Sequence, residues 1–491
     1  MANYILSKSS FVRSVQCQKS LYLYKNFYDQ RDKVSFSQQA VFNRGTSVGL
    51  LARKLFPGGI DVTPKSIFKY EESAKLTQLL IAEGKEIIYE AAFIYDEVLV
   101  AVDILVKENG KWKALEVKSS ASISDTYVLD ASLQNYVIKG SGLPLDDFII
   151  VYMNRDYIRH GALDLKELFI QQSVKKDVEK RSPYIKEQIA KSKSMLAGNS
   201  MPDIRIGEHC FNPYPCDYMG TCWKDISANS VFDIGGMTKK KMFELYHQGY
   251  IKMKDIPDDL ELSPSFKTQI KAIKENRLII DKKGISDFLN TLHYPIYFLD
   301  FETFMPAIPI YDGSHPYEHI PFQYSLHYKE TKDGELIHKE FLADAGLDPR
   351  KVFTERLLDD TKGKGDILVY NKDFEKKIMK DLSFDFPQYR NDFKERISRI
   401  KDLAIPFSKK YYYAPEMKGS YSLKAVLPAL VPDLKYDELI VKDGNTASLT
   451  FESLQTESDL LKIADSRDNL LAYCKVDTLA MVRILEILEK I

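Results

Sequence analysis

The sequence predicts an α/β protein made of more than one domain. A single domain has roughly 100–200 residues, and the chain has 491. Short apolar runs typical of buried strands, such as VLVAVDILV and YFLDFETF, occur beside segments with helical apolar spacing, such as LLAYCKVDTLAMVRILEIL. Strand and helix patterns mixed in this way are typical of α/β folds.

The composition is that of an ordinary soluble globular protein, with 44% hydrophobic and 28% charged residues. The formal net charge of −1 gives no global attraction to nucleic acid, so a nucleic-acid site would need a local basic patch. The N-terminal residues lack the apolar core of a signal peptide, and no apolar run reaches the roughly 18 residues of a membrane span. We therefore expect a cytoplasmic protein without a membrane partner, in which the 5 cysteines form no disulfide framework.

Three of the cysteines have a spacing that indicates a metal site. The segment HCFNPYPCDYMGTCW places Cys210, Cys216 and Cys222 at C-x5-C-x5-C in a loop rich in Pro, Gly and aromatic residues. The fourth ligand would be the adjacent His209, which suits zinc, or Cys17, which would complete four thiolates for zinc or an iron–sulfur cluster. The alternative is a chance group of buried thiols.

A predicted hairpin precedes this loop. In VLVAVDILVKENGKWKALEVKSS, two apolar runs flank the turn signal KENGK. Asp103 falls in the first strand, and Glu116 and Lys118 share one face of the second. Two carboxylates that hold Mg²⁺ or Mn²⁺ beside a lysine are what metal-dependent phosphodiester hydrolysis requires, although an isolated ExK motif is usually a surface charge pair.

The order of these parts over residues 1–225 resembles RecB-like PD-(D/E)xK nucleases with an iron–sulfur cluster, including CRISPR-associated exonucleases of that class. The resemblance implies that Asp103 and Glu116 are metal ligands and that Lys118 is catalytic. It also implies a 4Fe–4S cluster, with zinc as the alternative, and supporting residues on the helix after the hairpin; the residues concerned are Cys17, Cys210, Cys216, Cys222, Gln134 and Tyr136.

Two departures from that family stand in the same region. Many of these nucleases have an early histidine, which VFNRGTSVGLLARKLFPGGI lacks, and their Gln-x-x-x-Tyr signature is shortened here to QNY. Glu90 could replace the missing ligand, but a salt bridge is the more ordinary role for it. A domain that binds DNA without cutting it is therefore an alternative.

Residues 226–288 are expected to form a helical linker. The stretch MTKKKMFELYHQGYIKMKDIP resembles a helix–hairpin–helix module, which contacts phosphates through backbone amides and nearby lysines, here Lys239, Lys240 and Lys241. A packed helical spacer with a solvated basic face is the alternative.

The stretch YFLDFETF, residues 297–304, places Asp300 and Glu302 on one side of an apolar strand. Two buried carboxylates repel each other, so a cation is expected between them. Two later segments carry candidate partners. Residues 367–380 are predicted to run from a strand into a helix with Asn371 and Glu375 on one helical face, and the last long helix carries Tyr473 and Asp477 four residues apart.

This pattern over residues 289–491 resembles the DnaQ-like 3′→5′ exonucleases of the tyrosine subtype, which have an RNase H-like fold. The resemblance implies two divalent ions held by Asp300, Glu302, Glu375 and Asp477, a supporting Asn371, and Tyr473 orienting the attacking water. Glu375 replaces the usual aspartate, with Asp373 as the fallback. The segments between the motifs resemble an uncharacterised bacterial domain family that accompanies RecB-like domains. Gln323 and Tyr324 are expected near the site on a second strand of the sheet. Candidate phosphate contacts are Lys418, Ser420, Tyr421 and Lys424, with ordinary loop packing as the alternative.

The expected architecture is thus a restriction-endonuclease-like domain and an RNase H-like domain joined by a helical linker. The expected function is metal-dependent cleavage of nucleic acid, with trimming of single-stranded or frayed DNA in repair or defence. No G-x-x-x-x-G-K-S/T motif is present, so strand separation would need a partner such as a helicase. The alternative is a nucleic-acid-binding scaffold with one or both nuclease centres inactive.

Overall fold

The computed structural model describes residues 5–66, 69–198, 200–434, 436 and 439–491. The chain forms two compact units. The first contains the chain up to Asp225 together with Ala307–Tyr317, and the second contains Ile226–Pro306 and Glu318–Ile491. Both units combine helices with sheets, which confirms the predicted α/β class. In the described residues, no helix has the length and apolar character needed to cross a membrane.

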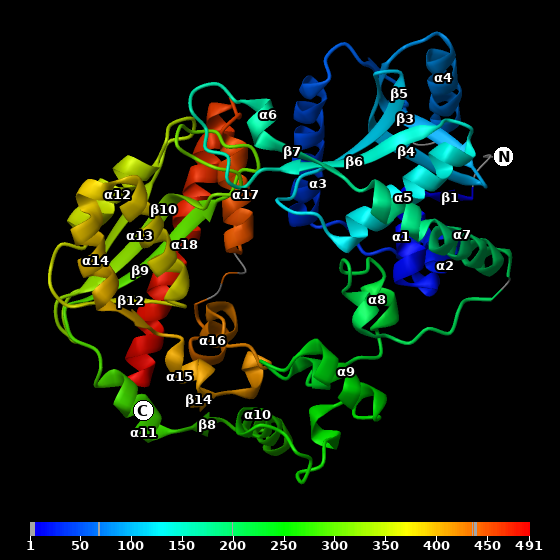
Figure 1. The fold of residues 1–491 in the computed structure, drawn as a ribbon. Coiled ribbons are helices and arrows are strands. Elements are labelled where there is room, and N and C mark those ends of the chain that lie inside the picture. The colour runs from blue at the N-terminus through cyan, green and yellow to red at the C-terminus, as the bar shows by residue number, and fades with distance from the viewer. Residues whose placement is uncertain (1–4, 67–68, 199, 435, 437–438) are drawn as a thin grey trace. The chain divides into compact units, whose positions relative to one another are not determined.

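One sheet organises the first unit, in the order β2-β3-β4-β5-β6-β7 with β1 paired to β4 (Figure 1). Strands β3, β4 and β5 are antiparallel neighbours, and β6 runs parallel to β5. The strands are β1 (Leu6–Ser7), β2 (Ile60–Asp61), β3 (Ile87–Tyr95), β4 (Val98–Glu108), β5 (Lys111–Lys118), β6 (Leu145–Met153) and β7 (Phe169–Ser173).

The predicted hairpin is confirmed as β4 and β5. Glu108 pairs with Lys111 across a two-residue turn. Asn109 and Gly110 both have positive φ, at 51° and 78°, as a type I′ turn requires.

Helices cover this sheet, and α5 is central because it packs on β3, β4, β6 and α7. It begins after Ser124, whose hydroxyl accepts the backbone N–H of Tyr127, and its buried Leu129, Leu133 and Val137 recur every fourth residue. The helices are α1 (Lys8–Gln16), α2 (Gln18–Asn26), α3 (Phe36–Ala52), α4 (Tyr70–Ala82), α5 (Asp125–Gly140), α6 (Leu165–Leu168), α7 (Lys175–Ala197) and α8 (Met219–Cys222).

A five-stranded sheet in the order β11-β10-β9-β12-β13 organises the second unit. Strand β10 is antiparallel to both β9 and β11, whereas β12 is parallel to β9 and β13. Strands β8 and β14 form a separate pair. The strands are β8 (Ile279–Ile280), β9 (Ile296–Phe304), β10 (Ile320–Lys329), β11 (Ile337–Leu342), β12 (Asp366–Val369), β13 (Ile400–Asp402) and β14 (Tyr412–Tyr413).

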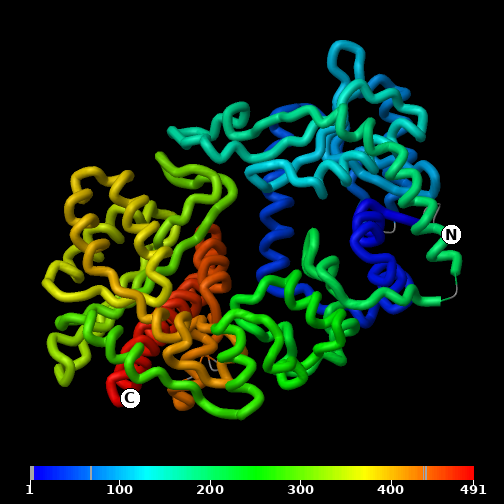
Figure 2. The backbone as a smooth tube through the Cα atoms, turned by 60° about the horizontal axis from the view of Figure 1, so that its bottom comes forward, coloured from blue at the N-terminus to red at the C-terminus, as the bar shows by residue number. Residues whose placement is uncertain are grey.

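Helices cover both faces of this sheet. In Figure 1, α12, α13 and α14 (yellow) lie on one face and the long α18 (red) on the other, and Figure 2 shows α18 beside the orange α16 segment, which it contacts. The helices are α9 (Lys239–His247), α10 (Pro264–Glu275), α11 (Lys282–Leu289), α12 (Arg350–Asp360), α13 (Asp373–Asp385), α14 (Arg390–Arg399), α15 (Ile405–Ser408), α16 (Leu423–Leu430), α17 (Gly444–Leu454) and α18 (Leu460–Leu488).

Residues 226–288 pack within the second unit. A Cβ added to Gly235 would lie 1.6 Å from the carbonyl oxygen of Gly419, so the two backbones approach as closely as glycines allow. The Gln269 side chain bonds both the N–H and the carbonyl of Gly235, at 2.8 and 3.0 Å. The turn before α9 is therefore held against the loop at Gly419.

Residues 307–317 pack within the first unit. The Arg159 guanidinium donates to the carbonyls of Pro309 and Ile310, at 3.0 and 2.8 Å. The Tyr317 hydroxyl donates to the carbonyl of Ser119. These bonds satisfy backbone groups that would otherwise lack partners.

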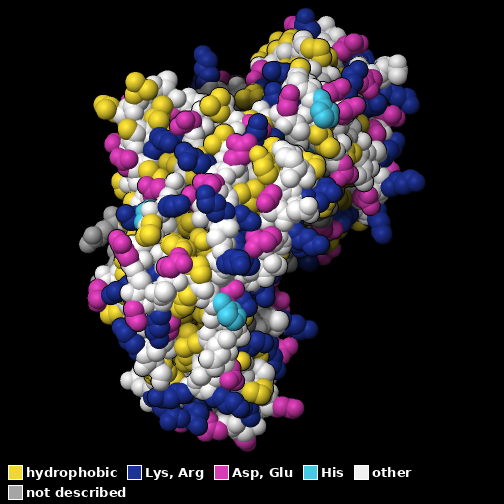
Figure 3. Space-filling model, turned by 90° about the vertical axis from the view of Figure 1, so that its left-hand side faces the viewer, with side chains coloured by type: hydrophobic (Ala, Val, Ile, Leu, Met, Phe, Trp, Pro, Cys, Tyr) yellow, Lys and Arg dark blue, Asp and Glu magenta, His cyan; other side chains and the backbone are white. Residues whose placement is uncertain are grey.

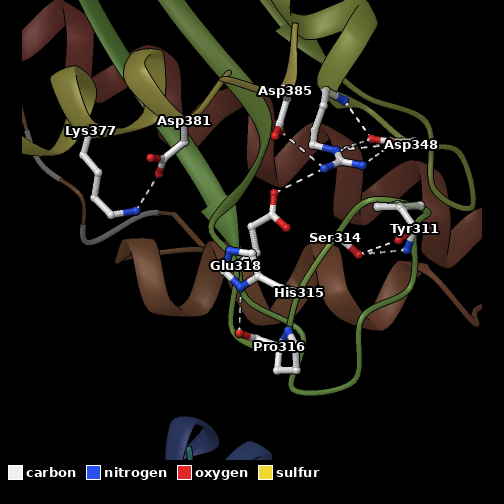
Figure 4. Close-up of polar contacts among 10 residues, drawn as sticks. Tyr311, Ser314, His315, Pro316, Glu318, Asp348, Lys377, Asp381 and Asp385 are labelled. Carbon is white, nitrogen blue, oxygen red and sulfur yellow. Dashed lines mark hydrogen bonds and ion pairs between the residues drawn. The ribbon is translucent and has the colours of Figure 1, made fainter. Parts of the chain in front are cut away.

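A buried arginine ties three segments of the second unit together. Arg350, only 5% exposed, lies 2.7 Å from Asp348, 3.3 Å from Glu318 and 3.4 Å from Asp385. Figure 4 labels these three acids around the arginine.

On the surface, positive and negative side chains are interspersed over the face in Figure 3, and the sequence has nearly equal numbers of Lys and Arg (69) and of Asp and Glu (70).

Candidate active site

The two acids of β9 face the side of the sheet that α17 and α18 cover. The alternate residues Tyr297, Leu299 and Phe301 belong to the apolar cluster on the opposite face, with side chains of α12, α13 and α14. Phe304, on the same side as the acids, packs against Phe451 of α17 at 5.1 Å between ring centroids. Strand alternation thus turns both carboxylates away from the large apolar cluster.

A third carboxylate joins them from α18. Ligand oxygens of Asp300, Glu302 and Asp477 all lie within 4.8 Å of one another. Glu302 is 7% exposed and Asp477 is 5% exposed. Among the residues that the structure describes, no other group of three or more candidate ligands converges so closely. Carboxylate oxygens clustered in this way suit a hard divalent cation such as Mg²⁺ or Mn²⁺.

The electrostatics of this acid triad (Asp300, Glu302 and Asp477) favour a cation. Burial and the neighbouring Asp477 raise the pKa of Asp300 well above its ordinary value. Burial, Asp300 and Asp477 do the same to the pKa of Glu302. Burial also raises the pKa of Asp477 to about 6, although Tyr436 and Tyr473 hydroxyl groups oppose this by hydrogen bonding. A divalent ion would relieve the repulsion that raises these values.

Two tyrosines and a lysine flank Asp477. The Tyr436 hydroxyl donates to Asp477 Oδ1, and the ring centroids of Tyr436 and Tyr473 lie 6.2 Å apart. The Lys424 ammonium lies 5.6 and 5.3 Å from these two centroids and donates to the carbonyl of Lys442 at 2.6 Å. Lys424 is exposed, and its charge opposes the rise in pKa of all three acids.

Tyr473 and Lys424 were predicted from the sequence, whereas Tyr436 was not. Tyr473 lies one helical turn before Asp477, so spacing revealed it. Tyr436 lies in the segment between α16 and α17, and its contact with Asp477 spans 41 residues. No local pattern signals such a contact.

Glu375 lies next to the triad but outside its 4.8 Å limit. It is 2% exposed, and burial followed by the charge of Asp300 raises its pKa well above the ordinary value. The structure records no hydrogen-bond partner for its Oε2 among the described residues. The fallback Asp373 is exposed at the start of α13.

The prediction that Asn371 shares a helical face with Glu375 is wrong. Helix α13 begins at Asp373, and Asn371 precedes it with φ of 72°. The Asn371 N–H donates to Asp402 Oδ1 at 3.0 Å. Asparagine tolerates this left-handed conformation better than most residues, so Asn371 shapes the turn between β12 and α13.

A cavity of about 310 Å³ opens beside Glu302, with Phe374, His319, Gly444 and Ser448 in its walls. Gly444 is the first residue of α17, and a Cβ there would lie 3.3 Å from Glu302 Oε2. The absence of a side chain therefore lets the helix begin close to the carboxylate.

A buried polar network fixes α18 on the sheet behind the acids. Gln323 donates to the carbonyl of Leu470 at 2.8 Å. The Thr478 hydroxyl lies 2.7 Å from Ser325 Oγ and 2.8 Å from His327 Nδ1. These contacts set the position of Asp477, the residue before Thr478. Gln323 lies behind the site in this network.

The predicted centre of the first unit is also assembled. The N–H of Val117 donates to Asp103 Oδ2 at 2.6 Å. Lys118 Nζ lies 2.8 Å from Glu116 Oε1 and 2.7 Å from Asp130 Oδ2. Gln134 donates to Glu116 Oε2 at 2.8 Å and to Asp130 Oδ1 at 3.2 Å.

Tyr136 does not join this centre. It lies two residues after Gln134 on α5, which turns its side chain to another face. Its hydroxyl lies 3.3 Å from Asp96, and its ring packs on Tyr95 at 5.6 Å between centroids.

Two residues of this centre had no sequence signal, Lys8 and Asp130. Lys8 Nζ lies 2.6 Å from Glu116 Oε1 and 3.5 Å from Asp130 Oδ2. Burial opposes ionisation of Glu116, yet the Lys118 and Lys8 ammonium groups hold its pKa well below the ordinary value. Burial and the charge of Glu116 raise the pKa of Asp103 to about 7.

Glu90 forms a salt bridge, the more ordinary of its two predicted roles. Its Oε1 accepts Arg53 Nη2 at 2.8 Å. Its φ of 55° interrupts the pairing of β3 with β4 opposite Asp103, because Tyr89 pairs with Ile104 and Ala91 with Val102.

Four cysteines line one small cavity of the first unit: Cys17, Cys210, Cys216 and Cys222. Cys17 lies between α1 and α2, so the structure brings together residues that are far apart in sequence. His209 lines the same cavity. All five cysteines of the chain are free thiols. The fifth, Cys474, is buried in the second unit, with Sγ 3.8 Å from Asp300 Oδ2.

The distances between the four sulfur atoms indicate which metal group the cysteines could bind. A tetrahedral zinc site with Zn–S bonds of ~2.3 Å places its sulfurs roughly 3.8 Å apart. No three of these sulfurs, all in described residues, lie within 4.8 Å of one another. Burial raises the pKa of the Cys17 and Cys222 thiols, which opposes thiolates unless a metal group is bound.

Comparisons with known proteins found a match to a domain of unknown function and similarity to uncharacterised proteins. A domain of unknown function, DUF2779, matches residues 297–422. An uncharacterized protein of Ureaplasma parvum serovar 3, UU173, is 27% identical over 245 residues. An uncharacterized MG366 homolog of Mycoplasma pneumoniae is 27% identical over 229 residues.

The matches are partial. They cover 44% and 42% of this chain and 34% of each relative, so the chain aligns with about a third of the length of these proteins. The domain match contains Asp300, Glu302 and Glu375 but ends before Tyr436 and Asp477.

Proposed function

We propose that the chain is a divalent-metal-dependent nuclease whose second unit trims nucleic acid from the 3′ end. The expected substrate is single-stranded or frayed DNA, and the expected setting is repair or defence in the cytoplasm. The convergence of Asp300, Glu302 and Asp477 within 4.8 Å carries the proposal. Glu302 and Asp477 are buried and Asp300 is partly buried, so metal ions held by the three carboxylates would offset their mutual repulsion.

The topology of the second unit supports an RNase H-like, DnaQ-like interpretation. Counted along the chain, the five strands have the order 3-2-1-4-5, and the second strand is antiparallel to the others. The acids lie on the central first strand and the last helix, as the resemblance implies.

Each residue in and around the triad would have its own role in the reaction. Asp300, Glu302 and Asp477 would hold Mg²⁺ or Mn²⁺, with Glu375 at the edge of the site. Such ions lower the pKa of bound water and offset charge on the leaving oxygen. Tyr436 orients Asp477 through its hydrogen bond, and Tyr473 would position the attacking water.

Two further features would engage the substrate. The exposed Lys424 presents a positive charge beside the acids, where it would attract a phosphate. The cavity beside Glu302, with Phe374 and Met305 in its wall, would accept an apolar surface such as that of a terminal base.

For the first unit we propose a restriction-endonuclease-like, RecB-like domain of the PD-(D/E)xK type. Three antiparallel strands, β3 to β5, followed by α5 and the parallel β6 support this fold. They place Asp103 and Glu116 on neighbouring strands with Lys118. The centre would act on DNA, by cleavage if Asp103 and Glu116 bind a metal ion.

At the four cysteines we propose a 4Fe–4S cluster rather than a single zinc ion. The wide sulfur spacing supports this choice, because each thiolate of a cubane cluster binds a different iron. Cys17, Cys210, Cys216 and Cys222 would then join the two N-terminal helices to the loop before the second unit.

Cleavage of 5′-labelled single-stranded DNA and RNA with Mn²⁺ tests the proposed nuclease. We expect a ladder that shortens from the 3′ end in the wild type and is lost in Asp300→Asn and Asp477→Asn. Asp381→Asn, which removes an exposed carboxylate paired with Lys377, is the matched control and should cut normally. Unchanged cleavage in Asp300→Asn would refute the proposal.

Anaerobic purification tests the cluster. We expect iron, sulfide and visible absorbance in the wild type, all strongly reduced in Cys222→Ser. Cys474→Ser is the control, because this thiol lies in the second unit. Zinc without iron in the wild type would favour the alternative metal.

A second candidate function is a nucleic-acid-binding scaffold, and one observation favours it for the first unit. Lys8 and Lys118 already neutralise Glu116 and Asp130. On this hypothesis, Lys118→Ala leaves cleavage unchanged, while DNA affinity depends on the first unit.

Under either function, a helicase or other repair or defence protein would supply strand separation.

A further inference from the structure

Lys8 is held rigidly where it meets the acids of the first unit. It is the first residue of α1, whose N-cap Ser7 forms a capping box with Ser10. Leu6 and Ser7 pair with Val98 and Leu99 of β4. The helix start is thus fixed from both sides, which directs the lysine side chain toward β5.

The Lys8 ammonium reaches the carboxylates that the sequence assigns to metal binding. Its Nζ lies 2.6 Å from Glu116 Oε1 and 3.5 Å from Asp130 Oδ2. Lys118 Nζ contacts the same two oxygens, at 2.8 and 2.7 Å. Each of these two oxygens therefore lies between two ammonium groups.

The other oxygens of Glu116 and Asp130 are also engaged. Gln134 Nε2 donates to Glu116 Oε2 at 2.8 Å and to Asp130 Oδ1 at 3.2 Å. All four oxygens of the two carboxylates thus form hydrogen bonds or ion pairs with side chains of the protein. The remaining acid, Asp103, accepts the N–H of Val117 through Oδ2.

This donor set does not fit a divalent ion. Such ions need several oxygen ligands with free lone pairs, and here ammonium groups occupy them. The two lysines balance the charges of Glu116 and Asp130, so the pair of acids needs no further cation. The acid triad of the second unit differs, because the nearby Lys424 lies over the rings of Tyr436 and Tyr473 and donates to the carbonyl of Lys442 rather than to a carboxylate.

We propose that Lys8 is the resident cation of the first unit's acidic centre and excludes a divalent ion from it. Glu116 and Asp130 then form a lysine-neutralised structural centre, and metal binding by the whole chain belongs to the second unit. This inference goes beyond the proposed 3′→5′ activity and does not depend on it. It replaces the expectation that Asp103 and Glu116 bind metal.

Counting bound Mn²⁺ tests the proposal without measuring cleavage. Free Mn²⁺ is titrated by electron paramagnetic resonance against the full-length wild type, Glu116→Gln, Lys8→Met and the double variant Lys8→Met/Glu116→Gln. We expect the wild type and Glu116→Gln to bind the same amount of Mn²⁺. Lys8→Met should bind an additional ion, and the double variant should lose it again.

Controls separate charge removal from misfolding. Lys25→Met removes a lysine whose Nζ donates to the carbonyl of Ile5, and it should bind Mn²⁺ like the wild type. If Lys8→Met does not fold, as judged by circular dichroism, Lys8→Gln takes its place because the amide can still donate to Glu116. The comparison of the wild type with Glu116→Gln does not require a substitution at Lys8, so it tests the proposal even if no Lys8 variant folds.

Either of two results would overturn the proposal. One is loss of a bound ion in Glu116→Gln while Lys8 is present, since the wild-type centre would then hold metal. The other is a folded Lys8 variant that binds no additional ion. Neither result bears on the triad, whose role is judged by cleavage in Asp300→Asn.

Discussion

Tyr436 donates a hydrogen bond from its hydroxyl group to Oδ1 of Asp477, 41 residues further along the chain. Both residues are buried, so water does not compete strongly for this bond. The segment between α16 and α17 therefore supports a carboxylate of α18. Partners of this kind fix the orientation of a metal ligand.

Tyr436→Phe should weaken metal binding or cleavage by about 10-fold to 100-fold, the usual effect of losing such a partner. The ring remains, so packing against Tyr473 is preserved. Mn²⁺ affinity and the cleavage rate measure the effect. Tyr184→Phe is the control, because Tyr184 is exposed on α7 of the first unit. Equal behaviour of the two variants would contradict a role for Tyr436.

Lys424→Met should slow cleavage while leaving Mn²⁺ affinity equal to or higher than that of the wild type. Its ammonium would no longer attract the substrate phosphate, and a charge that repels metal ions would be gone. Lys424→Arg keeps the charge and should restore most of the rate. Steady-state kinetics at two salt concentrations measure this. A loss of rate that arginine does not restore would point instead to the bond with the Lys442 carbonyl.

Metal stabilisation should depend on pH. The pKa of Asp477 is raised from 3.8 to about 6, so the folded state binds more protons than the unfolded state between these values. In the absence of metal, this group therefore destabilises the fold as pH rises through that window. Mn²⁺ binds the ionised carboxylate of Asp477. The increase in melting temperature on adding Mn²⁺ should therefore be larger at pH 7.5 than at pH 5.

The gain from Mn²⁺, rather than the melting temperature itself, is the useful measurement. Burial lowers the pKa of His327 from 6.5 to about 4. This histidine destabilises the fold as pH falls from 6.5 toward 4, opposite in sign to Asp477. Asp477→Asn should abolish most of the gain at either pH, and a gain in the wild type that does not change with pH would contradict the prediction.

Gly235→Ala should destabilise the second unit by about 3 kcal/mol, the upper range for inserting a methyl group into packed structure. The new Cβ would meet the Gly419 carbonyl at 1.6 Å, a contact with backbone that cannot move aside easily. Thermal unfolding measures the change. Gly49→Ala in α3 is the control, because nothing lies within 4 Å of its added Cβ. A Gly235→Ala variant as stable as the wild type would contradict the prediction, because it would show that the backbone shifts to relieve this contact.

The sequence predicted the parts of the site that obey local periodicity. Alternation along β9 placed Asp300 and Glu302 on one face, and helical spacing on α18 paired Tyr473 with Asp477. The turn KENGK predicted the hairpin that carries Asp103 and Glu116. Each of these patterns depends only on neighbours in the chain.

Contacts between distant segments were not predictable in this way. Lys8, Asp130 and Tyr436 reach their partners through tertiary packing, and nothing in their own segments marks them. Asn371 was misplaced because its φ of 72° delays the start of α13. Tyr136 was expected to support the same centre as Gln134, but residues two apart on a helix point in different directions.

Helix α1 has a role at each of its ends. Lys8 at its start meets Glu116, and Cys17 directly after its last residue lines the cysteine cavity. A hydrogen-bonded helix of 9 residues is about 14 Å long. The acidic centre and the cysteine cavity are therefore held a fixed distance apart by one short helix, and a substitution that unwinds α1 would disturb both.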